Sequence, residues 1–254
     1  MAGMRIEAIR LLARDPAGLA AFLREALGFA GAGPGRLQLG DEFVEIARAD
    51  GAPYPADIVS NDTRFQHFAV IVSDMDAALR RLRAVAGWTA ISTAGPERLP
   101  EASGGASAFK FRSPEGHPLE LLQFPSGRAP DPWDARPGLH LGIDHSAIGV
   151  ANTEASIGFY EGLGFAVAAR QTNRGAEQGR LDGVGGEPVV EVTALNPPGG
   201  APPHLELLCY LRPSARSSGV AAPDGVAATR LVVWGMKEAR EDPDGHRLVE
   251  PGFD

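Results

Sequence analysis

The chain has 254 residues, of which 44% are hydrophobic and 22% charged, and its net charge of −8 argues against a nucleic-acid-binding surface. Its single cysteine, Cys209, excludes an internal disulfide framework and a multi-cysteine zinc site. Because no apolar run approaches the roughly 20 residues of a membrane-spanning helix and no signal peptide is evident, we expect a cytoplasmic protein without a membrane partner, monomeric or homodimeric.

The first predicted elements occupy residues 1–50. A strand at RIEAIRLLARD is followed by a helix at PAGLAAFLREALGF, with proline in its first turn, and by strands at RLQLG and EFVEIAR.

The same order returns in residues 64–126. FQHFAVIV predicts a strand, and SDMDAALRRLRAVAG predicts a helix that Ser73 or Asp74 caps and whose apolar residues recur on one face. Two further strands, ASAFKFR and PLELLQF, are joined by the turn SPEGH. Glycine and proline, 32 and 21 residues, separate such elements throughout the chain.

A predicted linker at 125–138 precedes a third copy at 141–213, with IDHSAIGV as its first strand and TEASIGFYEGLGF as its helix. The strands FAVAARQT, EPVVEVTAL and HLELLCYL follow. A shortened fourth copy at 226–254 keeps the strands in ATRLVVWG and PDGHRLVE but lacks the helix. We therefore predict an α+β fold of repeated βαβββ modules, arranged as an N-terminal half, 1–127, and a C-terminal half, 138–254.

The module order and the motifs HFAVIV, HSAIGV, PEGHPLELLQF and HLELLCY resemble the vicinal oxygen chelate superfamily. That superfamily includes glyoxalase I, extradiol dioxygenases, methylmalonyl-CoA epimerases and bleomycin-resistance proteins. The resemblance implies paired, curled, mixed β-sheets around a cavity, with metal ligands on the first and last strand of each paired module. It does not identify the reaction, because one fold supports several chemistries.

Four residues recur at matching points of the second and third modules. His67 and His145 are each third in the first strand, and Glu120 and Glu206 are central in the last strand. A carboxylate between leucines is costly to bury unless it is paired or bound to a cation. Two imidazoles and two carboxylates suit one divalent ion such as Zn²⁺, Ni²⁺, Co²⁺, Fe²⁺ or Mn²⁺.

The pairing of modules decides whether these residues meet. Sequential pairing yields two incomplete sites, which are Glu45–His67–Glu120 and His145–Glu206–Glu250 with Arg230 nearby. Module one has Ala8 or Ile9, and module four Arg230, where a histidine would stand. Crossed pairing, of module two with three and of one with four, assembles the whole set. We predict crossed pairing and a second pair, holding Glu45 and Glu250, that is catalytically empty.

Three functions compete. We favour a metal-dependent lyase or isomerase that binds a small substrate through vicinal oxygens, with Glu120 or Glu206 as the base and with apolar neighbours raising the carboxyl pKa. The second is an extradiol dioxygenase using Fe²⁺, two histidines and one glutamate. The third is a metal-free binding protein like the bleomycin-resistance proteins, with a cleft lined by Trp88, Trp133 or Trp234. No glycine-rich phosphate loop indicates an organic cofactor.

The other histidines and the cysteine are interpreted as structural. His204 shares a strand face with Glu206 and could support a metal ligand or act as an acid–base residue, but its place at the start of a strand favours a structural role. His117 and His246 recur in the turns PEGH and PDGH, which indicates turn architecture. We expect His140 near the linker to be exposed and Cys209 to pack in the core.

Two polar stretches, 92–107 and 171–187, are candidate lids because each precedes the late strands of a ligand-bearing module. They carry arginines that either meet an anionic substrate or are solvated, namely Arg98, Arg174 and Arg180.

Overall fold

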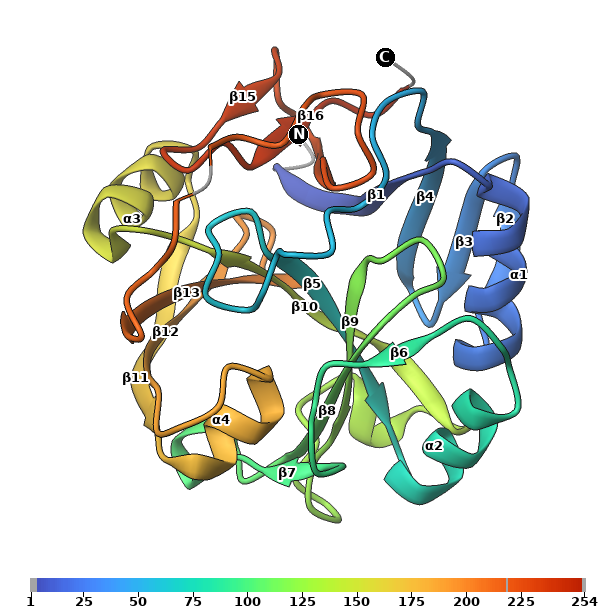
Figure 1. Cartoon of the computed structure of the whole chain (residues 1–254). Coiled ribbons are helices and arrows are strands. Elements are labelled where there is room, and N and C mark those ends of the chain that lie inside the picture. Colours follow the sequence, from blue (N-terminus) through green and yellow to red (C-terminus); the bar gives the residue numbers. More distant parts are fainter. Residues whose placement is uncertain (1–3, 218, 253–254) are drawn as a thin grey trace.

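The computed structural model describes residues 4–217 and 219–252, which form two mixed β-sheets with helices packed beside them (Figure 1). Module one comprises β1 (Arg5–Ala13), α1 (Pro16–Leu27), β2 (Ala30–Gly33), β3 (Arg36–Leu39) and β4 (Glu42–Arg48). Module two comprises β5 (Gln66–Val72), α2 (Met75–Arg83), β6 (Thr89–Ala90), β7 (Glu97–Arg98), β8 (Ser107–Arg112) and β9 (Pro118–Gln123).

Module three comprises β10 (His140–Gly149), α3 (Thr153–Gly162), β11 (Ala166–Arg174), α4 (Ala176–Asp182), β12 (Val189–Asn196) and β13 (His204–Arg212). Module four has β14 (Arg230–Trp234), β15 (Arg240–Glu241) and β16 (Arg247–Val249). As predicted, no helix joins its strands among the described residues. The segment 171–187, expected to be a polar loop, instead contains the end of β11 and the short helix α4.

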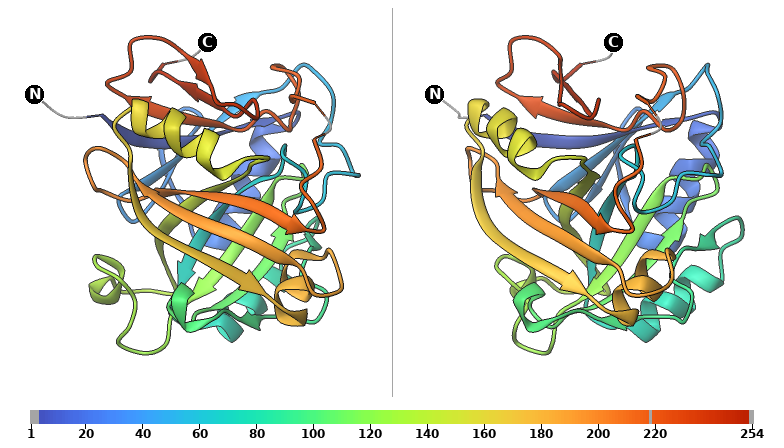
Figure 2. Two further views of the ribbon diagram at one scale, coloured as in Figure 1. Left: turned by 90° about the vertical axis from the view of Figure 1, so that its left-hand side faces the viewer. Right: turned by 60° about the vertical axis from the view of Figure 1, so that its left-hand side comes forward.

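Each sheet takes strands from both halves of the chain. The nine-stranded sheet has the order β11-β12-β13-β10-β5-β9-β8-β6, with β7 beside β8, and joins modules three and two. The seven-stranded sheet, β15-β16-β14-β1-β4-β3-β2, joins modules four and one. Figure 2 shows the N-terminal strand (blue) and the C-terminal strands (red) at the same end of the molecule. The crossed pairing predicted from the sequence is therefore the one observed.

The two-residue period of the strands separates a core face from a polar face in the nine-stranded sheet. On β5, Phe68, Val70 and Val72 belong to the main hydrophobic core, together with the buried residues of α1 and α2. The alternate residues of β5 point to the opposite face, yet they are buried as well. This sheet is therefore covered on both sides, and polar residues on its second face need partners.

Side-chain caps begin the helices where the sequence predicts them. Asp74 accepts a hydrogen bond from the Ala77 backbone amide at 2.9 Å, so Asp74 rather than Ser73 caps α2. Asn152 caps α3 in the same way. None of the helices in the described residues has the length and apolarity needed to cross a bilayer.

Two turn histidines connect modules that belong to different sheets. The Nε2 atom of His117, in the turn between β8 and β9, lies 2.9 Å from the carbonyl oxygen of Leu12 on β1. His246, in the matching turn of module four, contacts the carbonyl oxygen of Gly149 on β10 at 2.8 Å. Their recurrence in PEGH and PDGH is thus structural, as the sequence predicted, because each imidazole satisfies a backbone carbonyl of the other sheet.

Burial lowers the pKa of His117 from 6.5 to about 4, even though the Leu12 carbonyl opposes this effect. The imidazole is therefore neutral in the folded protein, donating to Leu12 and accepting from the Ser113 hydroxyl. Its contribution to stability is fully present above pH 6.5 and is lost as the pH falls towards 4, because the unfolded chain then takes up the proton more readily.

We predict that His117→Gln, whose amide can still donate to Leu12, reduces this pH dependence. Between about pH 7.5 and 4.5, the wild-type free energy of unfolding should fall by roughly 2 kcal/mol more than that of the variant. Urea unfolding at both pH values measures the difference. Equal losses in the two proteins would contradict the assignment.

Candidate metal centre

Strand pairing brings the two predicted histidines together. In the antiparallel β5–β10 pair, His67 lies opposite Ala147 and His145 lies opposite Ala69. Glu120 on β9 and Glu206 on β13 lie beside these same alanines in the neighbouring parallel pairs. All four predicted ligands therefore project from one region of the sheet, on the face away from the core, around two small residues.

Three of the four residues form a tight, buried cluster. His67 Nε2 lies 2.8 Å from Glu120 Oε2, and His145 Nε2 lies 3.8 Å from the same oxygen. One donor atom from each of the three lies within 4.8 Å of the others. Glu206 is adjacent, with its Oε2 atom 3.6 Å from His145 Nε2, but it is not part of this cluster.

Asp144, which the sequence analysis did not single out, orients one histidine. Its Oδ2 atom lies 2.7 Å from His145 Nδ1, so that nitrogen carries a proton and Nε2 faces the carboxylates. Burial alone would lower the pKa of His145, but Glu206 and Asp144 raise it to about 9. Without a metal the imidazole is therefore protonated between two carboxylates. The sequence signal for Asp144 was its place directly before His145 on the first strand of module three.

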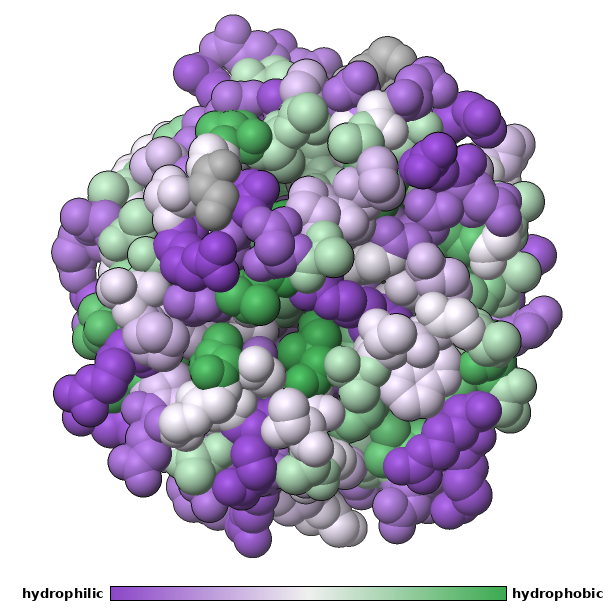
Figure 3. All heavy atoms as spheres, in the orientation of Figure 1, coloured by the Kyte–Doolittle hydropathy of each residue, from purple (hydrophilic) through white to green (hydrophobic). Residues whose placement is uncertain are grey.

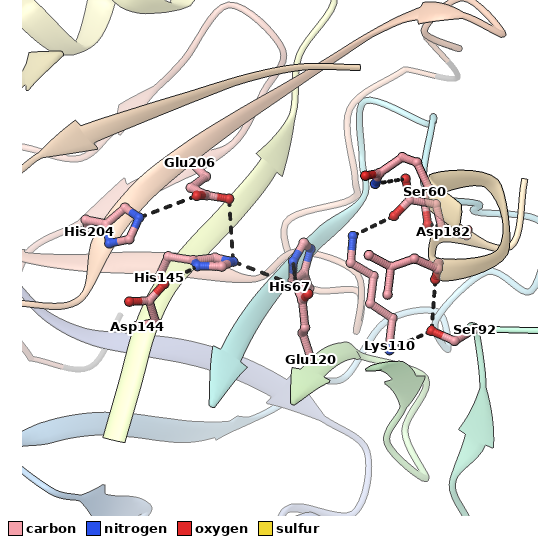
Figure 4. A network of polar contacts seen from close by, with 12 residues as sticks. Ser60, His67, Ser92, Lys110, Glu120, Asp144, His145, Asp182, His204 and Glu206 are labelled. Atoms are coloured by element: carbon pink, nitrogen blue, oxygen red, sulfur yellow. Dashed lines mark hydrogen bonds and ion pairs between the residues drawn. The ribbon is translucent and has the colours of Figure 1, made fainter. Parts of the chain in front are cut away.

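Glu206 and His204 form the outer part of the site (Figure 4). His204 Nε2 lies 3.5 Å from Glu206 Oε1, and both residues line the cavity, so His204 belongs to the site despite the structural role expected for it. Burial by itself would raise the pKa of Glu206, but His145 and His204 lower it to about 2. The expectation that apolar neighbours raise the carboxyl pKa was wrong, because it omitted these histidines.

The cluster opens into a cavity of about 390 Å³. Its walls come from β8 and β9 on one side and from β11–β13 on the other, because the sheet curls (Figure 1). Figure 3 shows hydrophobic residues (green) near the middle of this face of the molecule, among mainly hydrophilic neighbours.

Both predicted lid segments form part of the cavity wall. Ser103, from 92–107, accepts a hydrogen bond from Gln171 at 2.5 Å, and Arg180 pairs with Glu97 at 2.6 Å. The cavity lining includes neither Arg98, Arg174 and Arg180 nor any of the three tryptophans, so the aromatic cleft expected of a drug-binding protein does not form there. The only arginine among the described lining residues is Arg128.

Lys110 and Asp182 are cavity residues that the sequence analysis missed. Lys110 Nζ lies 2.7 Å from Asp182 Oδ1, and both side chains are buried. Burial alone would lower the pKa of Lys110, but Asp182 and Glu120 raise it, so the amine is a cation. The sequence did contain a signal for Lys110. It is one of only two lysines in the chain, and on the strand ASAFKFR it stands between two phenylalanines, so its side chain lies on the opposite face of the strand from theirs.

His140 and Cys209 lie away from the cavity lining. His140 is half-buried at the start of β10, not exposed, and burial lowers its pKa to about 4. Cys209 packs in the main core on the face opposite Glu206, as predicted.

In the seven-stranded sheet, different residues occupy the positions that correspond to the His67–Glu120–His145 cluster. Arg10 occupies the register position of Ala69, and its Nε atom donates to Glu45 Oε2 at 3.0 Å. Val249, not Glu250, pairs with Val232 where a ligand would stand, and Glu250 is exposed beyond β16. The prediction that Glu250 belongs to this region was wrong by one residue of register. Within the described chain, this sheet supplies no residue to a metal-type cluster.

Comparison with known structures identifies the fold. Glyoxalase I from Zea mays superimposes with a TM-score of 0.62 at 16% identity, over 98% of this chain and 92% of that one. The chain has the glyoxalase I fold. A mutant form of the same maize enzyme gives a TM-score of 0.60, also at 16% identity, with 98% and 92% covered. No protein-family model matches the sequence, and no curated protein matches it.

The donor set of this glyoxalase-like fold fits a divalent metal ion. His145 Nε2 is buried without a hydrogen-bond partner and faces Glu120 and Glu206. With Nδ1 bound to Asp144, His145 Nε2 can exchange its proton for a metal cation, which the two neighbouring carboxylates would also stabilise. Two imidazoles and one or two carboxylates suit Zn²⁺, Ni²⁺, Co²⁺, Fe²⁺ or Mn²⁺.

If both histidines hold one ion, His67→Ala and His145→Ala should each lower the bound metal from near one ion per chain to a small fraction of that. His140→Ala removes a histidine of β10 that does not line the cavity, and it should keep the metal. Metal analysis of protein purified without chelator measures all three. A full metal content in either His67→Ala or His145→Ala would contradict a shared site.

Proposed function

We propose that this chain is a metal-dependent lyase or isomerase that moves a proton on a small substrate bound through vicinal oxygens. The observation that carries the proposal is the position of Glu206, which lies next to the His67–Glu120–His145 cluster but outside it. This arrangement supports a division of roles in which three side chains hold the metal and the fourth carboxylate acts on the substrate.

His67, His145 and Glu120 are the proposed ligands because they are buried and their donor atoms converge. An ion held there would act as a Lewis acid on the substrate oxygens. Asp144 keeps the proton on His145 Nδ1, so Nε2 remains available to the ion.

Glu206 is the proposed general base. Both carboxylates line the cavity, but the side chain of Glu206 is 20% exposed, compared with 5% for Glu120, so Glu206 is the more accessible of the two. His204, at 3.5 Å from the second oxygen of Glu206, can orient the carboxylate and share the transferred proton. Glu120 has no comparable access and would serve the metal alone.

An extradiol-type, Fe²⁺-dependent dioxygenase is the second candidate, and one observation favours it. The tight cluster contains two histidines and one carboxylate, the ligand set that non-haem iron oxygenases use. Glu206 argues against it, because a fourth carboxylate beside the cluster crowds the position where oxygen would bind. Oxygen consumption with catechol by the Fe²⁺-loaded protein would favour this candidate over the first.

Substitutions of Glu206 and Glu120 should have different effects on activity and on metal binding. We predict that Glu206→Gln keeps the metal but slows proton exchange at the hydroxyl-bearing carbon of hydroxyacetone by about 10²- to 10⁴-fold, whereas Glu120→Gln loses the metal. Metal analysis and NMR detection of solvent deuterium incorporation measure the two effects. Full exchange activity in Glu206→Gln, or no exchange by the metal-loaded wild type, would refute the assignment.

A further inference from the structure

The cavity contains a second polar cluster that the proposed reaction does not use. Lys110 Nζ lies 2.7 Å from Asp182 Oδ1, while the Tyr210 hydroxyl and the Gln178 amide each donate to Asp182 Oδ2 at 2.6 Å. All four residues line the cavity and are buried. Figure 4 shows Lys110 and Asp182 on the side of His67 and Glu120 opposite to Glu206 and His204.

Two serines in loops, Ser60 and Ser92, help to hold this cluster in place. The hydroxyls of Ser60 and Ser92 donate to the backbone carbonyls of Asp182 and Leu181, at 2.7 and 3.0 Å. The Ser92 hydroxyl also accepts from the Lys110 backbone amide at 2.8 Å. The position of the Lys110 ammonium is therefore set from several sides before any ligand binds.

The ammonium is directed at the same space as the metal cluster. Lys110 and Glu120 are directly opposite each other in the β8–β9 pair, so their side chains leave the same face of the sheet. An ammonium has three donor hydrogens, and the bond to Asp182 uses one of them. Lys110 is only 4% exposed, so a ligand oxygen that met it would do so away from bulk water.

The charges around the cavity limit what it can bind. Among the residues that the structure describes, four carboxylates line it, from Glu120, Asp144, Asp182 and Glu206. Against them stand Lys110 and Arg128, and Arg128 is paired with Glu101. Even with a divalent ion present, these groups leave no excess positive charge for an anionic ligand.

The cavity lining also has an apolar part. It includes the side chains of Leu99, Leu122, Val190, Val192 and Leu208. The volume of about 390 Å³ is at the small end of the range for ligand sites. A molecule bound in the cavity can therefore meet hydrocarbon as well as the two polar clusters.

We propose that Lys110, held by Asp182, is a substrate-specificity residue that donates a hydrogen bond to a third oxygen of an uncharged, largely apolar substrate. This inference rests on the proposed function, since the vicinal oxygens occupy the metal cluster. The substrate class is a small neutral compound that carries two adjacent oxygens and a further carbonyl or hydroxyl oxygen across an apolar ring or chain.

Three catechols test the class on the Zn²⁺-loaded protein, in which the redox-inert ion prevents turnover. Calorimetric titration compares catechol, 3,4-dihydroxyacetophenone, which adds a neutral carbonyl, and 3,4-dihydroxybenzoate, which adds a carboxylate. We expect the ketone to bind at least about tenfold more tightly than catechol, the gain of a hydrogen bond to a charged donor. The benzoate should bind no more tightly than catechol.

Variants of the cluster test whether Lys110 causes the tighter binding of the ketone relative to catechol. In Lys110→Met the ketone should lose its advantage over catechol, while catechol affinity and zinc content stay unchanged. Tyr210→Phe removes a different partner of Asp182 and should retain most of the advantage, which controls for general loosening of the cavity. If Lys110→Met does not fold, the double variant Lys110→Met/Asp182→Asn, which leaves no buried charge unpaired, should show the same loss.

The possible outcomes distinguish a failure of the role proposed for Lys110 from a failure of the proposed metal-dependent function. If the wild type binds zinc and catechol but the ketone has no advantage, or the advantage survives in the lysine variants, the role of Lys110 is refuted and the metal site stands. Tighter binding of the benzoate would refute the neutral class. If the wild type binds no zinc, both proposals fail.

Discussion

The antiparallel pairing of β5 with β10 is the contact on which the candidate site depends. It joins the second and third modules across the midpoint of the chain, and its register sets His67 opposite Ala147 and His145 opposite Ala69. A slip of one residue would turn each histidine to the other face of the sheet, because side chains alternate along a strand. Burial of Phe68, Val70 and Val72 against the helices opposes such a slip.

The two sheets use one architecture for two purposes. Around the site, alanines at 69 and 147 leave room between the histidines and glutamates. In the seven-stranded sheet, Arg10 stands at the position of Ala69, and its guanidinium fills the space and neutralises Glu45. One sheet therefore carries the proposed chemistry, while the other contributes backbone contacts, such as the bond from His117 to Leu12, that tie the sheets together.

The sequence predicted the fold, the crossed pairing and the convergence of two histidines with Glu120, since these follow from a repeat whose copies can be aligned. It did not predict the bond between Lys110 and Asp182, because 72 residues separate them and a short helix in an expected loop positions Asp182. It placed Glu250 in register wrongly, because a short final strand has few apolar positions to fix the alignment. The pKa of Glu206 depended on the histidines around it, which spacing along the chain does not reveal.

X-ray absorption spectroscopy of the zinc-loaded protein, combined with its zinc-to-protein ratio, tests the central claim most directly. A single ion shared by the two modules predicts one zinc per chain, coordinated by two imidazole nitrogens together with carboxylate oxygens. A spectrum with one imidazole or none, or a ratio of two ions per chain, would contradict a site built across the β5–β10 pair.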